Sequence, residues 1–194
     1  MKTFLQQSTD NELVKSFQEG NNNALETLLE RHKDKLYSSI YFLVKDKYLA
    51  EDLFQEVFIK IIDRLRTNRY NEEGKFIQWS MRIAHNLCVD HFRKVKRTPP
   101  ILTSNSYDIF ETIHVCEAGP EKSLMKTQSH QGIRAIIDML PNEQREVIVL
   151  RHYGDMSFKE IAEKTNCSIN TALGRMRYAL LNMRKLMVEK QIEL

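Results

Sequence analysis

Cysteine, glycine and proline are scarce in this chain, and long hydrophobic runs are missing. The three cysteines, Cys88, Cys116 and Cys167, lie far apart and form no Cys-x-x-Cys pair. This spacing argues against a disulfide framework and against a cysteine zinc site. No segment approaches the roughly 20 apolar residues of a membrane-spanning helix, and the N-terminus lacks the apolar stretch of a signal peptide. We therefore expect a soluble, cytoplasmic protein with reduced thiols and no membrane segment.

Helical signals recur along the first half of the chain. Thr9 followed by Glu12 fits a capping box, Gly20 can end that helix, and Asn23 can start another. Side chains expected to face inward then recur every three or four residues, at Leu25, Leu29, His32, Leu36 and Ile40. Similar stripes predict helices over about 50–65 and 76–94. Strand-like alternation is missing, so the sequence predicts an all-α fold.

The composition changes at residue 98. Residues 98–121 contain no Lys or Arg, and their acids are Asp108, Glu111, Glu117 and Glu121. Prolines and a glycine break regular structure at both ends, which indicates a flexible acidic linker with at most a short turn near Ile109. Helices are predicted to resume near Lys122, with Pro141 forcing a new start. We predict two small helical domains, residues 1–97 and 125–194, joined by a linker over 98–124.

The strongest local pattern runs from Ser157 to Leu186. Ser157 with Glu160 predicts a capped helix, and Asn166 stands where a tight turn needs a positive φ. Ser168 can then cap a second helix. This arrangement is typical of a helix-turn-helix, in which the second helix enters the major groove of DNA.

The predicted second helix is strongly basic. Residues 171–185 contain no acids, and their basic residues are Arg175, Arg177, Arg184 and Lys185. Such a helix suits phosphates and guanine edges. A solvated face on an ordinary helical hairpin would have the same composition, so this pattern alone leaves two interpretations open.

A second basic segment lies at residues 75–97. Its only acid is Asp90, and three aromatic residues, Phe76, Trp79 and Phe92, are interleaved with the basic ones. Basic residues with aromatics can follow a nucleic-acid backbone and stack on unpaired bases. Burial in a core is the alternative for Trp79, because large aromatics at helical spacing are mostly buried.

These segments together resemble bacterial sigma factors. Residues 50–58 (AEDLFQEVF) resemble the helix that docks on polymerase, and residues 76–93 (FIQWSMRIAHNLCVDHFR) resemble the promoter-melting helix. Residues 140–147, 150–153 and 157–177 are similar to the second DNA-binding domain. The order, the spacing and the length are similar to the extracytoplasmic-function group, which keeps only these two domains.

The resemblance implies a role for individual residues. Docking on the β′ subunit of core RNA polymerase would fall to Asp52, Gln55, Glu56 and Phe58. Capture of the −10 strand would involve the 71–75 loop and Lys75, Phe76, Trp79, Arg82, Asn86 and Arg93. Binding of the −35 element would use Arg151, Ser168, Asn170, Thr171, Arg175 and Arg177. The acidic linker resembles the segment that passes through the polymerase cleft, so the β subunit and promoter DNA are further implied partners, with a separate anti-sigma factor as an inhibitor.

One position departs from the family pattern. Leu173 and Gly174 stand where a basic residue followed by Ser is usual. Leu cannot contact a phosphate, and a glycine inside a helix costs about 1 kcal/mol relative to Ala. We expect the preferred promoter sequence to be affected, but not the DNA-binding role.

Two other classes of protein were weighed. A helix-turn-helix repressor or activator with an N-terminal sensor domain would account for residues 157–177, but not for the basic-aromatic helix or the acidic face of residues 52–56. An enzyme would need a metal, phosphate or nucleophile motif. Glu51, Asp52 and Glu56 lack a helical His partner, and neither a GxxxxGK loop nor a nucleophile motif is present. We expect no enzymatic activity, no cofactor and no metal, with His85 and His91 in solvent or at a groove edge.

Overall fold

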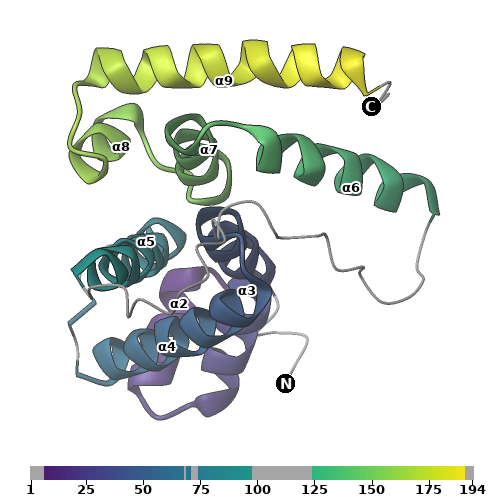
Figure 1. The fold of residues 1–194 in the computed structure, drawn as a ribbon. Helices are drawn as coiled ribbons and strands as arrows, with labels where there is room; N and C mark the ends of the chain where they lie inside the picture. Colours follow the sequence, from purple (N-terminus) through teal and green to yellow (C-terminus); the bar gives the residue numbers. More distant parts are fainter. Residues whose placement is uncertain (1–6, 68, 71–73, 98–123, 191–194) are drawn as a thin grey trace, which may run out of the picture.

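The computed structural model describes residues 7–67, 69–70, 74–97 and 124–190. The regular elements in these ranges are helices, which confirms the predicted all-α class (Figure 1). They are α2 (Asp10–Gln18), α3 (Asn22–Val44), α4 (Lys47–Arg66), α5 (Phe76–Arg97), α6 (Leu124–Met139), α7 (Asn142–Ile148), η1 (Val149–Tyr153), α8 (Phe158–Lys164) and α9 (Ile169–Glu189). The predicted turn near Ile109, Cys116, and residues 71–73 of the predicted −10 loop lie outside the described residues.

Helix α2 starts and ends where the sequence predicts. The Thr9 side chain accepts a hydrogen bond from the Glu12 backbone, and the Glu12 carboxylate accepts one from the Thr9 backbone, which completes the capping box. Gly20 follows the helix with a φ of +102°, a conformation that glycine adopts without steric cost. Asn21 then caps α3 by accepting from the Asn23 backbone at 3.1 Å, so α3 begins earlier than the Asn23 start that we predicted.

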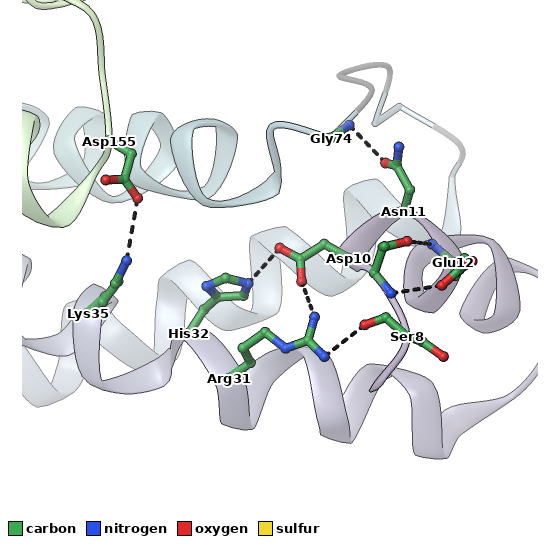
Figure 2. Close-up of polar contacts among 10 residues, drawn as sticks. Ser8, Asp10, Asn11, Glu12, Arg31, His32, Lys35, Gly74 and Asp155 are labelled. Atoms are coloured by element: carbon green, nitrogen blue, oxygen red, sulfur yellow. Dashed lines mark hydrogen bonds and ion pairs between the residues drawn. The ribbon is translucent and has the colours of Figure 1, made fainter. Parts of the chain in front are cut away.

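Polar contacts join α2 to its neighbours (Figure 2). Asp10 bonds both Arg31 and His32 of α3, and the Asn11 side chain accepts from the Gly74 backbone at 2.9 Å. His32 is buried, as the helical stripe predicts, and its ring lies 5.4 Å from that of Phe76. The short α2 is thereby fixed across α3 and the start of α5.

Helices α3, α4 and α5 pack on one another around an apolar core (Figure 1). Each contributes a stripe at helical spacing, and the α4 stripe is the one that the sequence predicts: Leu53, Val57, Ile61 and Leu65. Asp46 caps α4 by accepting from the Leu49 backbone at 2.9 Å, so this helix begins a few residues before position 50. The result is one N-terminal helical unit.

The C-terminal unit consists of α6 to α9. Helix α7 continues into the π-helical turn η1, which the sequence patterns did not predict. Residues 147–150 are all buried, so this part of the chain is surrounded by other elements. Arg145 is buried beside it and donates to the carbonyls of Asp138 and Leu140, which satisfies part of its guanidinium.

The two helical units touch each other. Helix α3 packs against both α7 and η1, and one apolar cluster contains buried residues of both units. The sequence predicts two domains on a linker but says nothing of their contact. This contact is a property of the described structure that residue patterns did not indicate.

Candidate nucleic-acid and polymerase interfaces

Helices α8 and α9 form the predicted helix-turn-helix. Ser157 and Glu160 make the predicted capping box at α8, and Asn166 adopts a φ of +50° in the turn that follows. Ser168 caps α9 by accepting from the Thr171 backbone at 3.0 Å. Three local predictions are thus confirmed, each because one side chain satisfies a backbone geometry close to it in sequence.

The start of α9 offers side chains of two kinds. Asn170 and Arg177 are exposed, and Arg175 is half-buried on another side of the helix. The hydroxyls of Ser168 and Thr171 lie 2.9 Å apart and bond each other, and the Ser168 hydroxyl also caps the helix, so both are less available to DNA than the sequence suggests. The small Ala172 and Ala179 are buried, which lets α9 lie close to the rest of its unit.

The departure at positions 173 and 174 is visible on the surface of α9. Leu173 is 44% exposed, and a Cβ added to Gly174 would meet nothing within 4 Å. Gly174 also lines a shallow groove between α7 and α9, together with Thr171, Arg175 and Tyr178. This part of the recognition helix therefore has an apolar side chain next to an open position.

Arg151 is exposed, but it also makes contacts that stabilise the structure around it. Its guanidinium donates to the Met156 carbonyl at 2.7 Å and lies 5.3 Å from the centre of the Phe158 ring. These contacts hold the loop before α8. Arg151 remains exposed at its position before the helix-turn-helix, so a phosphate could still reach it.

The residues predicted to bind the −10 strand fall into two groups according to their exposure. Lys75, Asn86 and Arg93 are exposed and Arg82 is half-buried. In contrast, Phe76 and Trp79 are buried, at 0% and 6% exposure, so their assignment to direct DNA contact is wrong for this structure. Their rings pack with Tyr70, whose ring centre is 4.8 Å from that of Trp79. This aromatic cluster stabilises the buried side of the first turn of α5.

The prediction for His85 is also wrong. We expected a solvent or groove-edge position, but His85 is 3% exposed and its Nε2 lies 2.8 Å from Oε1 of Glu146 in α7. Glu146 is 61 residues away in sequence, so no local pattern could indicate the pair. His91, by comparison, is half-buried.

The acidic residues of α4 share one exposed face. Asp52, Gln55 and Glu56 are all exposed, and Glu56 pairs with Lys60 at 2.9 Å. Phe58 does not belong to this face, because it lies on another side of α4, half-buried with its ring 4.4 Å from that of Phe54.

Two exposed apolar side chains on this face were missed by the sequence reasoning. Tyr48 is 79% exposed and Ile59 is 66% exposed. Tyr48 lies four residues before Asp52 and Ile59 four after Gln55, so helical spacing places them on either side of the polar residues. That spacing was the signal that could have found them.

The two described cysteines are thiols in different surroundings. Burial raises the pKa of the Cys88 thiol to about 12, which keeps it protonated, and Cys167 is half-buried beside Thr165. In the described part of the chain, no group of three or more His, Cys, Asp or Glu side chains is placed to hold a metal. None of the described helices is long and apolar enough to span a membrane.

Two family models match the chain. Residues 28–98 match Sigma-70 region 2, and residues 130–180 match Sigma-70 region 4. These segments contain most of α3, all of α4 and α5, and most of the residues from α6 to α9. The region 2 match leaves no place for a sensor domain in residues 28–98, so the repressor alternative fails.

Curated relatives span almost the same length. The chain is 28% identical to the RNA polymerase sigma-H factor of Pseudomonas aeruginosa, over 89% of this chain and 90% of that protein. It is 29% identical to the ECF RNA polymerase sigma factor SigW of Bacillus subtilis, over 89% and 93%. The fold is similar to that of the sigma factor RpoE in its complex with the anti-sigma factor NepR from Bartonella quintana, with a TM-score of 0.62, 21% identity, and coverage of 84% and 96%.

Matching regions 2 and 4 define a sigma factor, the class of protein that gives RNA polymerase its promoter specificity. Within that class, the chain belongs to the extracytoplasmic-function (ECF) group, as its two-region organisation and its relatives show. It acts in promoter-specific transcription initiation with RNA polymerase and binds DNA through the helix-turn-helix of region 4.

Proposed function

We propose that the two units divide the recognition of one promoter. The N-terminal unit, residues 1–97, docks on β′ through Asp52, Gln55 and Glu56 and captures the −10 strand with Lys75, Arg82, Asn86 and Arg93. The C-terminal unit, residues 125–194, binds the −35 element with Arg151, Asn170, Arg175 and Arg177, supported by the capping residues Ser168 and Thr171. Residues 98–124 connect them within the polymerase cleft, next to the β subunit.

One observation carries this proposal. Ser168 and Asn166 fix the start of α9 after a left-handed turn, and exposed Asn170 and Arg177 follow in the first turns of the helix. A helix whose N-terminal residues are exposed and basic is suited to the major groove. The exposed, acid-bearing face of α4 lies on the other unit, which separates polymerase docking from −35 binding.

The cellular setting follows from this role. A protein that acts on polymerase and promoter DNA works in the cytoplasm, and every residue proposed above serves binding and none serves catalysis. The structural relative from Bartonella quintana was solved with an anti-sigma factor. We extend that property to this chain and propose that a separate anti-sigma protein inhibits it.

A run-off transcription assay with core polymerase and a promoter library tests the proposed function. We expect the protein to direct transcripts from a subset of promoters that share −10 and −35 sequences. Core polymerase alone is the control. Transcripts that do not depend on the protein, or a preparation that binds promoter duplex but never copurifies with core polymerase, would contradict the proposal.

A further inference from the structure

An exposed leucine stands among the residues of α9 that are proposed to contact DNA. Leu173 is 44% exposed and helps to line a shallow groove together with Phe158 of α8. Asn170 lies three residues before it and Arg177 four residues after it, so helical spacing makes both its neighbours on the surface of the helix. An apolar side chain therefore lies between two exposed polar residues that are proposed to bind the −35 element.

The buried side of α9 shows which residues point away from the rest of the unit. Ala172 is 0% exposed and marks the inward side. Each residue turns the helix by about 100°, so Asn170 and Gly174, two residues before and after Ala172, point almost opposite to it. By the same reckoning Arg177 lies about 140° from Ala172, and Leu173 lies about 100° from it. Leu173 is thus on the flank of the outward side, next to the glycine.

Gly174 allows a partner to come close to this side of the helix. A glycine inside a helix is unfavourable relative to alanine, and the protein itself does not require one here, because an added Cβ would meet nothing within 4 Å. Close approach of a ligand to the backbone is a further reason for a glycine. Leu173 has a shorter side chain than a lysine or an arginine, so it reaches a base edge only if the helix backbone lies deep in the groove.

The chemistry of leucine restricts which base it can favour. The major-groove edges of the base pairs present hydrogen-bond donors, acceptors and the 5-methyl group of thymine. Leucine neither donates nor accepts a hydrogen bond, so packing it over the polar edge of guanine, cytosine or adenine would leave base atoms without a partner, which is unfavourable. Packing it against the thymine methyl group instead buries apolar surface on both sides.

The charges around Leu173 favour DNA over an apolar protein surface as its partner. Arg177 and Arg184 are exposed and line the same groove as Leu173. Residues 171–185 contain no acid, so the positive field along this part of α9 is not offset within the helix. Such a field attracts the phosphates that border the major groove. An apolar protein surface laid over the groove would instead have to desolvate both guanidinium groups.

We propose that Leu173 contacts the 5-methyl group of a thymine in the −35 element, and that Gly174 lets the backbone of α9 approach closely enough for this contact. The thymine lies between the contacts of Asn170 and Arg177. The inference rests on the proposed −35 role of α9 and adds a residue that determines which base is preferred. The apolar residue at position 173 then changes the preferred base pair without abolishing selectivity.

Removing a single methyl group from the DNA tests the contact. Holoenzyme assembled from the full-length protein and core polymerase first selects its preferred −35 sequence from a promoter library. Each thymine of that sequence is then replaced by deoxyuridine, which pairs in the same way but lacks the 5-methyl group. We expect one of these replacements to weaken promoter binding about 3- to 5-fold, as for the loss of one buried methyl group.

Variants at position 173 assign the effect to the leucine. Leu173→Ala should bind the thymine promoter more weakly than the wild type and should no longer distinguish thymine from deoxyuridine, which makes a double-mutant cycle across the contact. Leu173→Lys should change the preferred base at this position from thymine to guanine. Leu180→Ala is the matched control, because Leu180 is an equally exposed leucine two turns further along the same groove, and it should keep the wild-type response to deoxyuridine.

The role of the glycine is measured separately. Gly174→Ala should weaken promoter binding about 3- to 10-fold, because its methyl group would stand between the helix and the base edges. The same methyl group meets no protein atom within 4 Å, so thermal unfolding should show that the variant is at least as stable as the wild type. Undiminished promoter binding by Gly174→Ala would overturn the close approach.

The remaining outcomes separate this inference from the proposed function. A preferred −35 sequence that tolerates deoxyuridine at every thymine overturns the methyl contact, as does an equal response to deoxyuridine in the wild type and in Leu173→Ala. Unchanged promoter affinity and base preference in Leu173→Ala would mean that the leucine serves a contact with another protein, which also overturns it. A wild-type holoenzyme without any preference at −35 contradicts the proposed function, and the inference with it.

Discussion

The carboxylate of Asp10 connects α2 to α3, with 2.7 Å between its Oδ2 and Nε2 of His32. Its other oxygen accepts from Arg31 at 2.6 Å (Figure 2). Burial opposes the charge on Asp10, but the hydrogen bonds and charges of these two neighbours outweigh it and lower the pKa of Asp10 below 3.8. The ionised carboxylate therefore stabilises the folded state.

The stability contributed by Asp10 should depend on pH in a defined direction. Because its pKa is lower in the folded than in the unfolded chain, the contribution is present above about pH 4 and is lost as the pH falls through the folded value. We expect Asp10→Asn to lower the free energy of unfolding by about 1 kcal/mol at pH 7, since solvent partly screens the site, and by less near pH 3. Urea unfolding at both pH values measures this. Asp34→Asn, on an exposed part of α3, should show no such difference.

The polar face of α4 predicts a change in affinity without a change in stability. Glu56→Arg reverses the charge of an exposed residue whose described ion pair is with Lys60. We expect binding to core polymerase to be abolished, while the free energy of unfolding moves by about 0.5 kcal/mol or less. Pull-down and thermal unfolding measure the two quantities. Glu26→Arg on α3 is the control, and unchanged polymerase affinity in the Glu56 variant would remove the docking assignment.

Replacing either of two glycines with alanine should change the free energy of unfolding, in opposite directions at the two positions. Gly154→Ala places a Cβ 2.7 Å from the Leu150 carbonyl oxygen, a backbone atom that cannot move aside, so we expect a loss of about 1–3 kcal/mol. At Gly174 the added methyl group meets nothing within 4 Å inside a helix, and Gly174→Ala should stabilise the protein by about 0.4–1 kcal/mol. Chemical unfolding of both variants checks the pair. A stabilised Gly154→Ala variant would contradict the tight contact.

The division of the promoter between the units can be tested with one substitution in each. Because Leu173 has replaced a basic residue, we expect Arg177→Ala to weaken binding of −35 duplex by about 1–3 kcal/mol, the range of a lost base contact. Asn86→Ala should spare duplex binding but impair strand opening, because the proposed partner of Asn86 is an unpaired base. Duplex titration and permanganate footprinting separate these effects. Normal opening with Asn86→Ala, together with a melting defect alone in Arg177→Ala, would mean that the roles are reversed.

The sequence predicts those features that depend on neighbours along the chain. Thr9 and Ser157 cap their helices as expected, and Asn166 takes its left-handed turn, because each satisfies backbone groups within a few residues. His85 was misplaced since its partner lies 61 residues away. Trp79 shows that the candidate site is also hard to predict from sequence alone. Its basic neighbours suggest DNA contact, whereas tertiary packing buries its ring. Helices and turns are thus predictable from spacing, but pairing across the two units is not.

The run of four buried residues at 147–150 has an energetic consequence for the C-terminal unit taken alone. Neighbouring positions on a helix point in different directions, so burying four in succession requires partners on nearly every side. A C-terminal unit without α3 would expose part of this apolar surface to water, which costs free energy until another surface covers it. A C-terminal fragment cut at the linker should accordingly self-associate rather than remain monomeric.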